Sequence, residues 1–251
     1  MKKHIIILFL IVPINFLFSQ EINFTGKIEY KMTVAINRPI EYKSELFFNN
    51  THSLFVYTEV LQENVEEIDD SNNLNFNIIL KDSLAKEIFI NKSNDSLYEK
   101  HKNLISKNSY YSVERVPKIK WNITNQTKKI KDIECYLAKT TFRGRNYLVW
   151  FAPSLVNPVG PWKFNGLPGI ILEAYDDKRE VTFYVNRITI PYHFTNKPLN
   201  QELSVLSLNE HLHIMNNIDS EIGKKIQSKF GRGIQVKVET KISTIELNFN
   251  D

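Results

Sequence analysis

The chain has 251 residues, of which 42% are hydrophobic and 12% aromatic, and its formal net charge is +4. Such a composition supplies enough apolar surface for a large core, which excludes an intrinsically disordered chain. The 32 basic residues are nearly balanced by 28 acidic ones. This balance excludes the strongly positive footprint typical of a nucleic-acid-binding domain, so no nucleic acid is expected among the partners.

The first residues have the features of a secretory signal peptide. Two lysines precede an apolar run over residues 5–18, and Ser19 and Gln20 then lead into an ordinary polar sequence. The run is shorter than the roughly 20 apolar residues that a membrane span needs, although an uncleaved N-terminal anchor is the alternative. No cysteine directly follows the run, so a lipoprotein anchor is not expected. We therefore predict a signal peptide at 1–19, export of the protein, and a single mature domain at 20–251.

Alternating runs of β-branched and aromatic residues predict strands along most of the chain. The predicted strands are 24–36, 41–48, 53–60, 87–90, 96–98, 110–116, 133–142, 146–151, 170–175 and 181–190. Short turn signals such as Asn49-Asn50-Thr51 separate these runs, and few helical periods lie between them. This pattern predicts a mostly β fold, in which an antiparallel meander forms a strongly curved sheet or open barrel.

The single cysteine, Cys135, excludes an internal disulfide bond. Ile133, Cys135 and Leu137 share one face of their predicted strand. We therefore expect Cys135 to be buried as a small apolar residue, with a reactive or intermolecular thiol as the alternative.

One amphipathic helix is predicted in the C-terminal half, at about 207–229. Ser207 and Glu210 form a capping-box pattern at its start, and apolar residues then recur three or four positions apart. We expect this helix to cover one open side or end of the sheet, with docking on a membrane or partner as the alternative. A closing strand is predicted at 234–249, with a bulge near Ser243 where the apolar positions change face.

Residues that constrain the backbone concentrate between Gly144 and Gly169. Four of the eight glycines and four of the nine prolines fall there, together with two of the three tryptophans. Leu167-Pro168-Gly169-Ile170 predicts a type II turn, because Pro168 presets one φ angle and the glycine supplies the positive φ that follows. The residues expected to define this segment structurally are Gly160, Pro161, Gly166, Leu167, Pro168 and Gly169.

The stretch GPWKFNGLPGIILEAYD, residues 160–176, resembles the signature of the GLPGLI family of exported proteins of Gram-negative bacteria. At its centre the chain has Gly166-Leu167-Pro168-Gly169-Ile170-Ile171, with isoleucine at 170 where the name of the family has leucine. The run FRGRNYLVWFAP, residues 142–153, also resembles the hairpin and aromatic strand of the family. The resemblance covers most of the mature chain and implies a periplasmic or outer-membrane-associated protein with a single GLPGLI-type β domain. It implies no catalytic residue, because the family has no established activity.

The candidates for binding a ligand or partner are Arg143, Arg145, Trp150, Trp162 and Phe164. Arg143 and Arg145 flank a glycine at a predicted hairpin tip, where a guanidinium group could bind a carboxylate or phosphate. A solvated tip is the preferred alternative. Trp162 and Phe164 alternate, so their rings should lie on one face, where they either line a cleft for an apolar ligand or fill the core.

No metal site, cofactor or catalytic residue is predicted. His211 and His213 lie on different sides of the predicted helix, and we expect the remaining histidines, such as His101, to be solvated or hydrogen-bonded. Glu173 and Asp176 could form an acid pair at the end of the signature strand, but turn-forming or solvated carboxylates are the preferred interpretation. The sequence also has no nucleophile motif of the G-x-S-x-G kind.

We therefore expect a non-enzymatic binding or accessory protein of the periplasm or cell envelope. Its partner would be an outer-membrane or envelope protein, a peptide or an apolar ligand. The alternative hypothesis is an envelope hydrolase or processing factor that uses the carboxylates and arginines near residues 143–176. A purely structural subunit of an outer-membrane complex is the third hypothesis.

Overall fold

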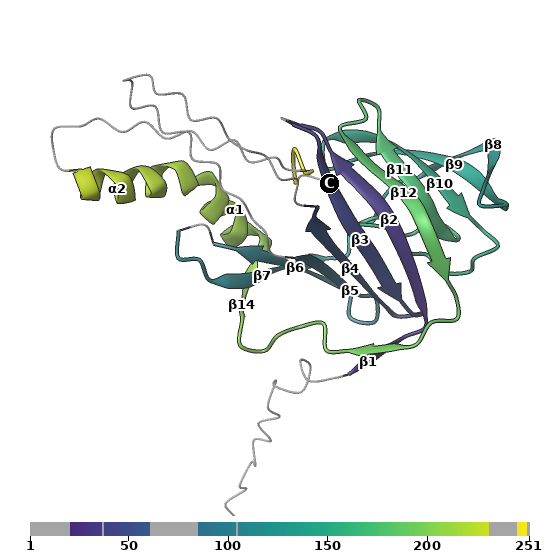
Figure 1. The fold of residues 1–251 in the computed structure, drawn as a ribbon, viewed down its shortest axis with the longest axis horizontal. Helices are drawn as coiled ribbons and strands as arrows, with labels where there is room; N and C mark the ends of the chain where they lie inside the picture. The colour runs from purple at the N-terminus through teal and green to yellow at the C-terminus, as the bar shows by residue number, and fades with distance from the viewer. Residues whose placement is uncertain (1–20, 37, 61–84, 104, 231–244, 250–251) are drawn as a thin grey trace, which may run out of the picture.

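The computed structural model describes residues 21–36, 38–60, 85–103, 105–230 and 245–249. The strands in these parts of the chain are β1 (Ile22–Phe24), β2 (Gly26–Val34), β3 (Ile40–Phe48), β4 (His52–Glu59), β5 (Lys86–Asn91), β6 (Ser96–Lys102), β7 (Ser109–Arg115), β8 (Asn122–Ile130), β9 (Ile133–Phe142), β10 (Arg145–Ala152), β11 (Ile170–Asp176), β12 (Val181–Thr189), β13 (Phe194–Asn196) and β14 (Ser204–Ser207). The helices are α1 (Leu208–Asn216) and α2 (Ile218–Phe230) (Figure 1). Neither helix is long and apolar enough to cross a membrane, within the residues that the structure describes.

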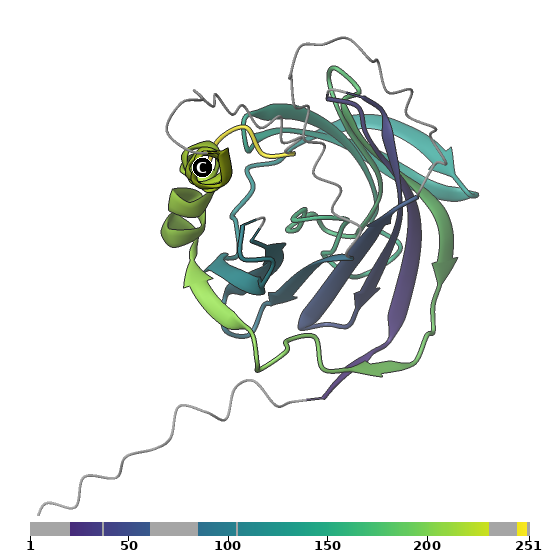
Figure 2. The same cartoon turned by 60° about the vertical axis from the view of Figure 1, so that its left-hand side comes forward.

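Twelve strands form one sheet, in the order β14-β7-β6-β5-β4-β3-β2-β12-β11-β10-β9-β8. The sheet consists of two antiparallel meanders, β2 to β7 and β8 to β12, which are joined by the antiparallel pairing of β2 with β12. β14 runs parallel to its neighbour β7, so the sheet is mixed rather than purely antiparallel. Figure 2 shows the strands along an arc around a common interior, with the helices next to β14. The predicted mostly β fold is confirmed.

The alternation of side chains explains why one face of the sheet is buried. In β2, Ile28, Tyr30 and Met32 are buried, while the residues between them are half-buried or exposed. Their neighbours across the sheet continue the same core, with Leu46 opposite Ile28 on β3 and Phe183 opposite Met32 on β12. Each such large apolar side chain contributes about 1.5–3 kcal/mol when it is fully buried, so this inner face supplies much of the stability.

A second, smaller apolar cluster lies on the opposite face of the sheet. β1 pairs with β13, and this two-stranded sheet brings Phe24 and Phe194 against Phe47 of β3. Leu54 of β4 and Phe89 of β5 complete the cluster. The cluster attaches the start of the folded domain to the outside of the first meander.

The aromatic side chains of the loop between β10 and β11, residues 153–169, fill part of the interior. Trp162 and Phe164 are 2% and 1% exposed, and their rings meet edge to face at a centroid distance of 5.2 Å. The Phe164 ring also lies 4.8 Å from the ring of Tyr147 and 6.1 Å from that of Phe183, measured between centroids. Of the two alternatives, packing in the core is therefore confirmed for both rings.

The prediction of a type II turn at Leu167-Pro168-Gly169-Ile170 is wrong, because the N–H of Ile170 does not donate to the carbonyl of Leu167. The N–H of Gly169 donates to the carbonyl of Leu167 at 2.8 Å, and the N–H of Ile170 donates to the carbonyl of Leu155 at 3.2 Å. Gly169 nevertheless has the positive φ that was predicted, at 149°. A Cβ atom added there would lie 2.2 Å from the carbonyl oxygen of Ala152, so close backbone approach is a second reason for glycine.

The predicted helix at 207–229 is present as two helices. The capping box is confirmed, because Ser207 and Glu210 bond reciprocally at the start of α1. The chain then breaks at Asn217, the C-cap of α1, before α2 begins. Residues 245–249 form an irregular segment rather than a strand, and the rest of the predicted closing strand, with the bulge near Ser243, lies outside the described residues.

Cys135 is fully buried in β9, as predicted. Burial, together with the nearby carboxylate of Glu173, raises the pKa of its thiol to about 11. The thiolate that reacts with oxidants or electrophiles is therefore scarce at neutral pH.

Candidate functional site

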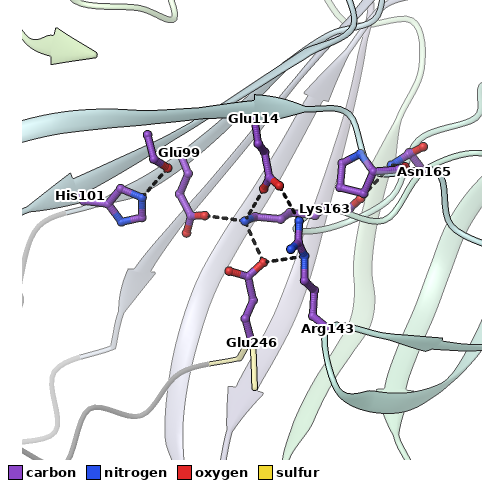
Figure 3. Close-up of polar contacts among 9 residues, drawn as sticks. Glu99, His101, Glu114, Arg143, Lys163, Asn165 and Glu246 are labelled. Atoms are coloured by element: carbon purple, nitrogen blue, oxygen red, sulfur yellow. Dashed lines mark hydrogen bonds and ion pairs between the residues drawn. The ribbon is translucent and has the colours of Figure 1, made fainter. Parts of the chain in front are cut away.

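A cluster of charged side chains surrounds Lys163 on the inward-facing side of the sheet (Figure 3). Lys163 is 1% exposed, and its Nζ atom lies 2.8 Å from a carboxylate oxygen of Glu99, 3.0 Å from one of Glu114 and 2.8 Å from one of Glu246. The three carboxylate side chains are themselves only 11–14% exposed. We call these four residues together with Arg143 the interior charge cluster.

Two strands and one tight bend place these groups together. Glu114 of β7 lies opposite Leu97 of β6, a fully buried core residue, and Glu99 follows Leu97 by two positions, so both carboxylates share the inward face. Lys163 reaches them from the loop between β10 and β11. The preceding residue, Trp162, has a φ of +56°, a conformation that is unfavourable for a bulky side chain by about 1–2 kcal/mol.

The hairpin between β9 and β10 adds Arg143 to the cluster. Arg143 and Gly144 have φ values of 49° and 79°, as in the two-residue turns that connect tight hairpins. The Arg143 guanidinium lies 2.5 Å from Glu114 through Nη2 and 3.4 Å from Glu246 through Nε. Its side chain is 4% exposed, so the preferred interpretation of a solvated hairpin tip is wrong. A buried guanidinium requires carboxylate partners, and the sequence alone does not show that β7 supplies one.

Arg145 belongs to a neighbouring ion-pair network. Its Nη1 atom donates to Asp176 at 2.8 Å and to Glu180 at 2.6 Å, and Asp176 also accepts the N–H of Val181. Glu173, in contrast, pairs with Lys128. The two carboxylates suggested as an acid pair thus lie in separate networks, and Asp176 is buried rather than solvated.

The C-terminal segment 245–249 is attached to the same hairpin. The N–H of Leu247 donates to the carbonyl of Arg143 at 2.9 Å, and Nε of Arg145 donates to the carbonyl of Ile245 at 2.8 Å. These two bonds lie on either side of Glu246 and hold its carboxylate toward Lys163. A Cβ atom at Gly144 would lie 2.8 Å from Cβ of Leu247, so the contact also requires glycine at the turn.

The interior charge cluster has three carboxylates and two cations, so one carboxylate is favoured to hold a proton. Burial, with a further contribution from Glu99, raises the pKa of Glu246 to about 7 against the opposing effect of Lys163. Burial alone would also raise the pKa of Glu99, but the Lys163 ammonium, His101 and His211 together outweigh it and lower that pKa to about 2. Burial acts to lower the pKa of Lys163, yet the carboxylates of Glu99, Glu246 and Glu114 raise it far above its usual value.

A histidine pair borders the cluster, and the sequence did not reveal it. The imidazole rings of His101 on β6 and His211 on α1 stack with a centroid distance of 3.9 Å. His101 bonds to the hydroxyl of Ser112 and His211 to that of Tyr110. Burial lowers the pKa of His101 to about 4 and also lowers the pKa of His211. The expectation of a hydrogen-bonded histidine is confirmed for His101, but its contact with His211 was not predicted.

The predicted binding residues do not converge on one site. Arg143 joins the interior charge cluster, Trp162 and Phe164 pack beside it in the core, and Arg145 lies in the adjacent network. Trp150 is separate, because its ring lies under Nζ of Lys128 at 4.5 Å from the ring centroid. The sequence reasoning missed the three glutamates and Lys163. Glu99 carried a signal, since it lies two positions after the buried Leu97 on the same strand face.

The described residues offer no group of three or more histidine, cysteine, aspartate or glutamate side chains that could hold a metal ion. They do include one buried hydroxyl without a hydrogen-bond partner, that of Tyr147, which is 1% exposed. Burial and the nearby carboxylates of Asp176 and Glu246 raise the pKa of this hydroxyl far above its usual value, against the effect of Arg145. Chemically, the interior charge cluster can hold a proton on Glu246, and its two cations neutralise most of the buried negative charge.

A shallow groove of about 450 Å³ lies over β8, β9 and β10. It is lined by Lys120, Asn122, Lys139, Thr140, Thr141, Asn146, Tyr147 and Leu148. Most of these side chains are polar, and two are lysines. The groove thus offers hydrogen-bond donors and positive charge.

Comparison with known proteins shows the fold but no family. No protein-family model and no curated protein matches the chain. Two solved structures of PNGF-II, in the P21 and C2 space groups, are similar to it with TM-scores of 0.53 and 0.50 at 13% sequence identity. Each match covers 78% of this chain but only 34% and 33% of the PNGF-II chains. The chain thus spans about a third of PNGF-II and shares a β-rich fold with that part.

Proposed function

We propose that this chain is an exported, non-enzymatic binding or accessory protein of the periplasm or cell envelope, and a member of the GLPGLI family. Export is supported by the signal-peptide pattern at 1–19, and the family by the signature at 160–176. In this proposal the mature domain catalyses no reaction and binds a partner through its surface.

The observation that carries this proposal is that the signature segment is used to hold the fold. Lys163 is buried among three carboxylates, and its neighbours Trp162 and Phe164 are buried among aromatic rings. The charges inside the sheet therefore satisfy one another, and the family signature describes a scaffold. We therefore expect the partner to bind on the outer surface of the domain.

The packing of the interior also favours one class of partner. The rings of Phe142, Tyr147, Trp162, Phe164 and Phe183 contact one another beside the charge cluster. An apolar ligand at that position would have to displace buried aromatic side chains. A protein or peptide bound on the surface requires no such rearrangement, so we favour it over an apolar ligand.

Export and partner binding are tested together in living cells. The full chain with a C-terminal affinity tag would be produced in a Gram-negative host, cross-linked in intact cells and recovered from the periplasm and envelope. We expect an intact mass that lacks the first 19 or 20 residues, and a cross-linked species of defined composition with an envelope protein. Cytoplasmic protein that still begins at Met1, or processed protein without any cross-linked partner, would contradict the proposal.

The second candidate function is an envelope hydrolase, and one observation favours it. Glu246 and Glu99 have pKa values of about 7 and about 2 in the same cluster, as an acid and a base of one catalytic site often do. The test is to assay the processed protein with chromogenic esters, phosphates and glycosides. Turnover that is lost in Glu246→Gln, while thermal stability is retained, would replace the binding proposal.

A further inference from the structure

We infer that β8 is a docking edge at which an extended acidic polypeptide segment adds to the sheet as a further strand. The inference rests on the proposed function as a binding protein, and it specifies the chemistry of the partner and the place where it binds. It is independent of where the protein is located in the cell, because the binding can be measured with purified components.

The two ends of the sheet differ in how they are protected. β14 is a strand of four residues, and α1 follows it directly and packs near it. β8 has nine residues and pairs with β9 on one side, in unbroken register over 127–130 and with a register shift between Ile123 and Thr127. It has no strand on its other side among the described residues. A strand of this length spans about 30 Å, which is enough to bind an extended segment through its main chain.

The turn after β8 shows which N–H groups face the open edge. Ile130 and Ile133 close a two-residue turn whose residues, Lys131 and Asp132, have φ values of 48° and 64°. The pair that closes such a turn exchanges both hydrogen bonds, and bonded and non-bonded pairs then alternate as far as Thr127, where the register shifts. The N–H of Lys128 therefore points toward β9. Those of Thr127 and Lys129 point outward, away from β9.

The charge around β8 selects an acidic partner. Residues 117–139 contain six lysines, at 118, 120, 128, 129, 131 and 139, but only two carboxylates, Asp132 and Glu134. All of these lysines except Lys128 are exposed. Lysines on an edge strand oppose pairing between two copies of the chain, because like charges would face each other. The same lysines attract an acidic segment, and the groove lined by Lys120 and Lys139 lies beside the strand.

The loop between β10 and β11, residues 153–169, which we call the signature loop, fixes the position of this edge. The indole N–H of Trp121, the residue before β8, donates to the carbonyl of Asn165 at 2.9 Å. The Asn165 amide donates in turn to the carbonyl of Pro117 at 3.2 Å. Thr140 of β9 donates to the carbonyl of Lys120 at 2.9 Å. A loop that is held by the interior charge cluster thus holds the segment that leads into β8, which is the preorganisation a docking strand needs.

The test uses two synthetic probes and the processed full chain. One probe is a fluorescein-labelled ten-residue peptide of alternating threonine and glutamate, and the other has lysine in place of every glutamate. Fluorescence anisotropy should show saturable binding of the acidic probe that weakens as salt is added, and little binding of the basic probe. Equal binding of the two probes, or none of either, would overturn the inference.

Two variants locate the binding. Thr127→Pro removes one outward N–H without changing the charge, and we expect the affinity for the acidic probe to fall about tenfold, the effect of losing one hydrogen bond. Lys129→Glu leaves the backbone intact, so it remains informative even if the proline variant misfolds, and it should lower the affinity about fivefold. Lys43→Glu, an exposed lysine on the central strand β3, is the matched control and should bind as the wild type does.

The remaining outcomes are also decisive. Wild-type affinity in both Thr127→Pro and Lys129→Glu would show that the probe binds elsewhere and would overturn the inference. A concentration-dependent dimer in sedimentation that Thr127→Pro abolishes would assign the edge to a second copy and overturn the acidic partner. Failure of the proposed function would be seen separately, in the processing, cross-linking and turnover of the chain.

Discussion

Lys163 connects segments that are far apart in the sequence. Its ammonium group joins β6, β7 and the C-terminal segment, while Trp162 and Phe164 on either side of it are buried in the core. A buried ammonium is unfavourable on its own, but the three carboxylates reverse this and raise its pKa. Packing and charge thus fix the same short stretch of chain.

Replacing Lys163 by methionine tests the strength of this connection. Lys163→Met keeps the length of the side chain but leaves three buried carboxylates with Arg143 as their remaining cation in the cluster. Removing one partner of a buried ion pair costs about 3–5 kcal/mol, and we expect a loss of that size in the free energy of unfolding in urea. The exposed Lys178→Met is the control and should change it by less than about 0.5 kcal/mol. Equal unfolding midpoints for the two variants would show that the cluster does not stabilise the fold.

The proton on Glu246 predicts a dependence of stability on pH. The pKa of Glu246 is raised from 4.5 to about 7 in the folded protein, so its stabilising contribution is complete below pH 4.5 and is lost as the pH rises through 7. His101, whose folded pKa is lowered to about 4, has the opposite effect as the pH falls below 6.5. The two effects overlap in the wild type, and a variant is needed to separate them.

Glu246→Gln provides that separation, because glutamine imitates the protonated acid at every pH. We expect the variant and the wild type to have similar melting temperatures near pH 4.5, and the variant to become increasingly the more stable of the two toward pH 8. Melting curves across this range measure the difference. A constant difference between the two proteins would show that Glu246 does not hold a proton in the folded state.

At the scale of single residues, the sequence predicts the positions of the aromatic side chains better than the pairing of the charged ones. Trp162 and Phe164 could be placed on one face by their alternation, and they are buried together. The pairing of Lys163 with Glu99 depends on which strands become neighbours across the interior. Periodicity within one strand carries no such information, so the cluster could not be derived.

At the scale of elements, the turns around Gly166 and Gly169 allow two effects to be compared. Both glycines have a strained backbone conformation, but only at Gly169 would an added side chain also overlap a neighbouring atom. Gly166 and Gly169 both have positive φ, at 85° and 149°. A Cβ at Gly166 would have its nearest atom at 3.8 Å, whereas one at Gly169 would overlap the carbonyl oxygen of Ala152 at 2.2 Å.

We expect Gly166→Ala to destabilise the fold by about 1–2 kcal/mol through its φ alone. Gly169→Ala should destabilise it by more than about 3 kcal/mol, because the overlap is added to the strain. Chemical denaturation measures both values. If the two substitutions cost the same, the close approach between Gly169 and Ala152 is not part of the folded structure.

The elements with apolar alternation were predicted well, and the others were not. β9 has the predicted bounds, 133–142, because its inward residues alternate with polar ones. β8 was missed, since a strand at the edge of the sheet that is exposed on both faces carries no apolar pattern. The break between α1 and α2 at Asn217 was also missed, because the apolar spacing continues through it.

At the scale of the whole molecule, the inside of the sheet holds the core and the buried ion pairs, and we propose the outside for recognition. Two meanders enclose the signature loop and its charges, and the loop in turn positions β8 at one end of the sheet through Asn165. The sequence predicts a mostly β fold. It does not predict that the pairing of β2 with β12 joins the two meanders. Pairing between strands about 150 residues apart leaves no local signal in a sequence.

The central claim is that the signature segment is scaffold and that recognition occurs on the surface, and Trp162→Ala tests it most directly. The measurement is the free energy of unfolding of this variant, together with the affinity of its folded form for the acidic peptide. We predict a loss of about 3–5 kcal/mol in stability, as for other large buried aromatic residues, and an affinity close to that of the wild type. Wild-type stability combined with loss of peptide binding would contradict the account and make residues 160–169 the binding site.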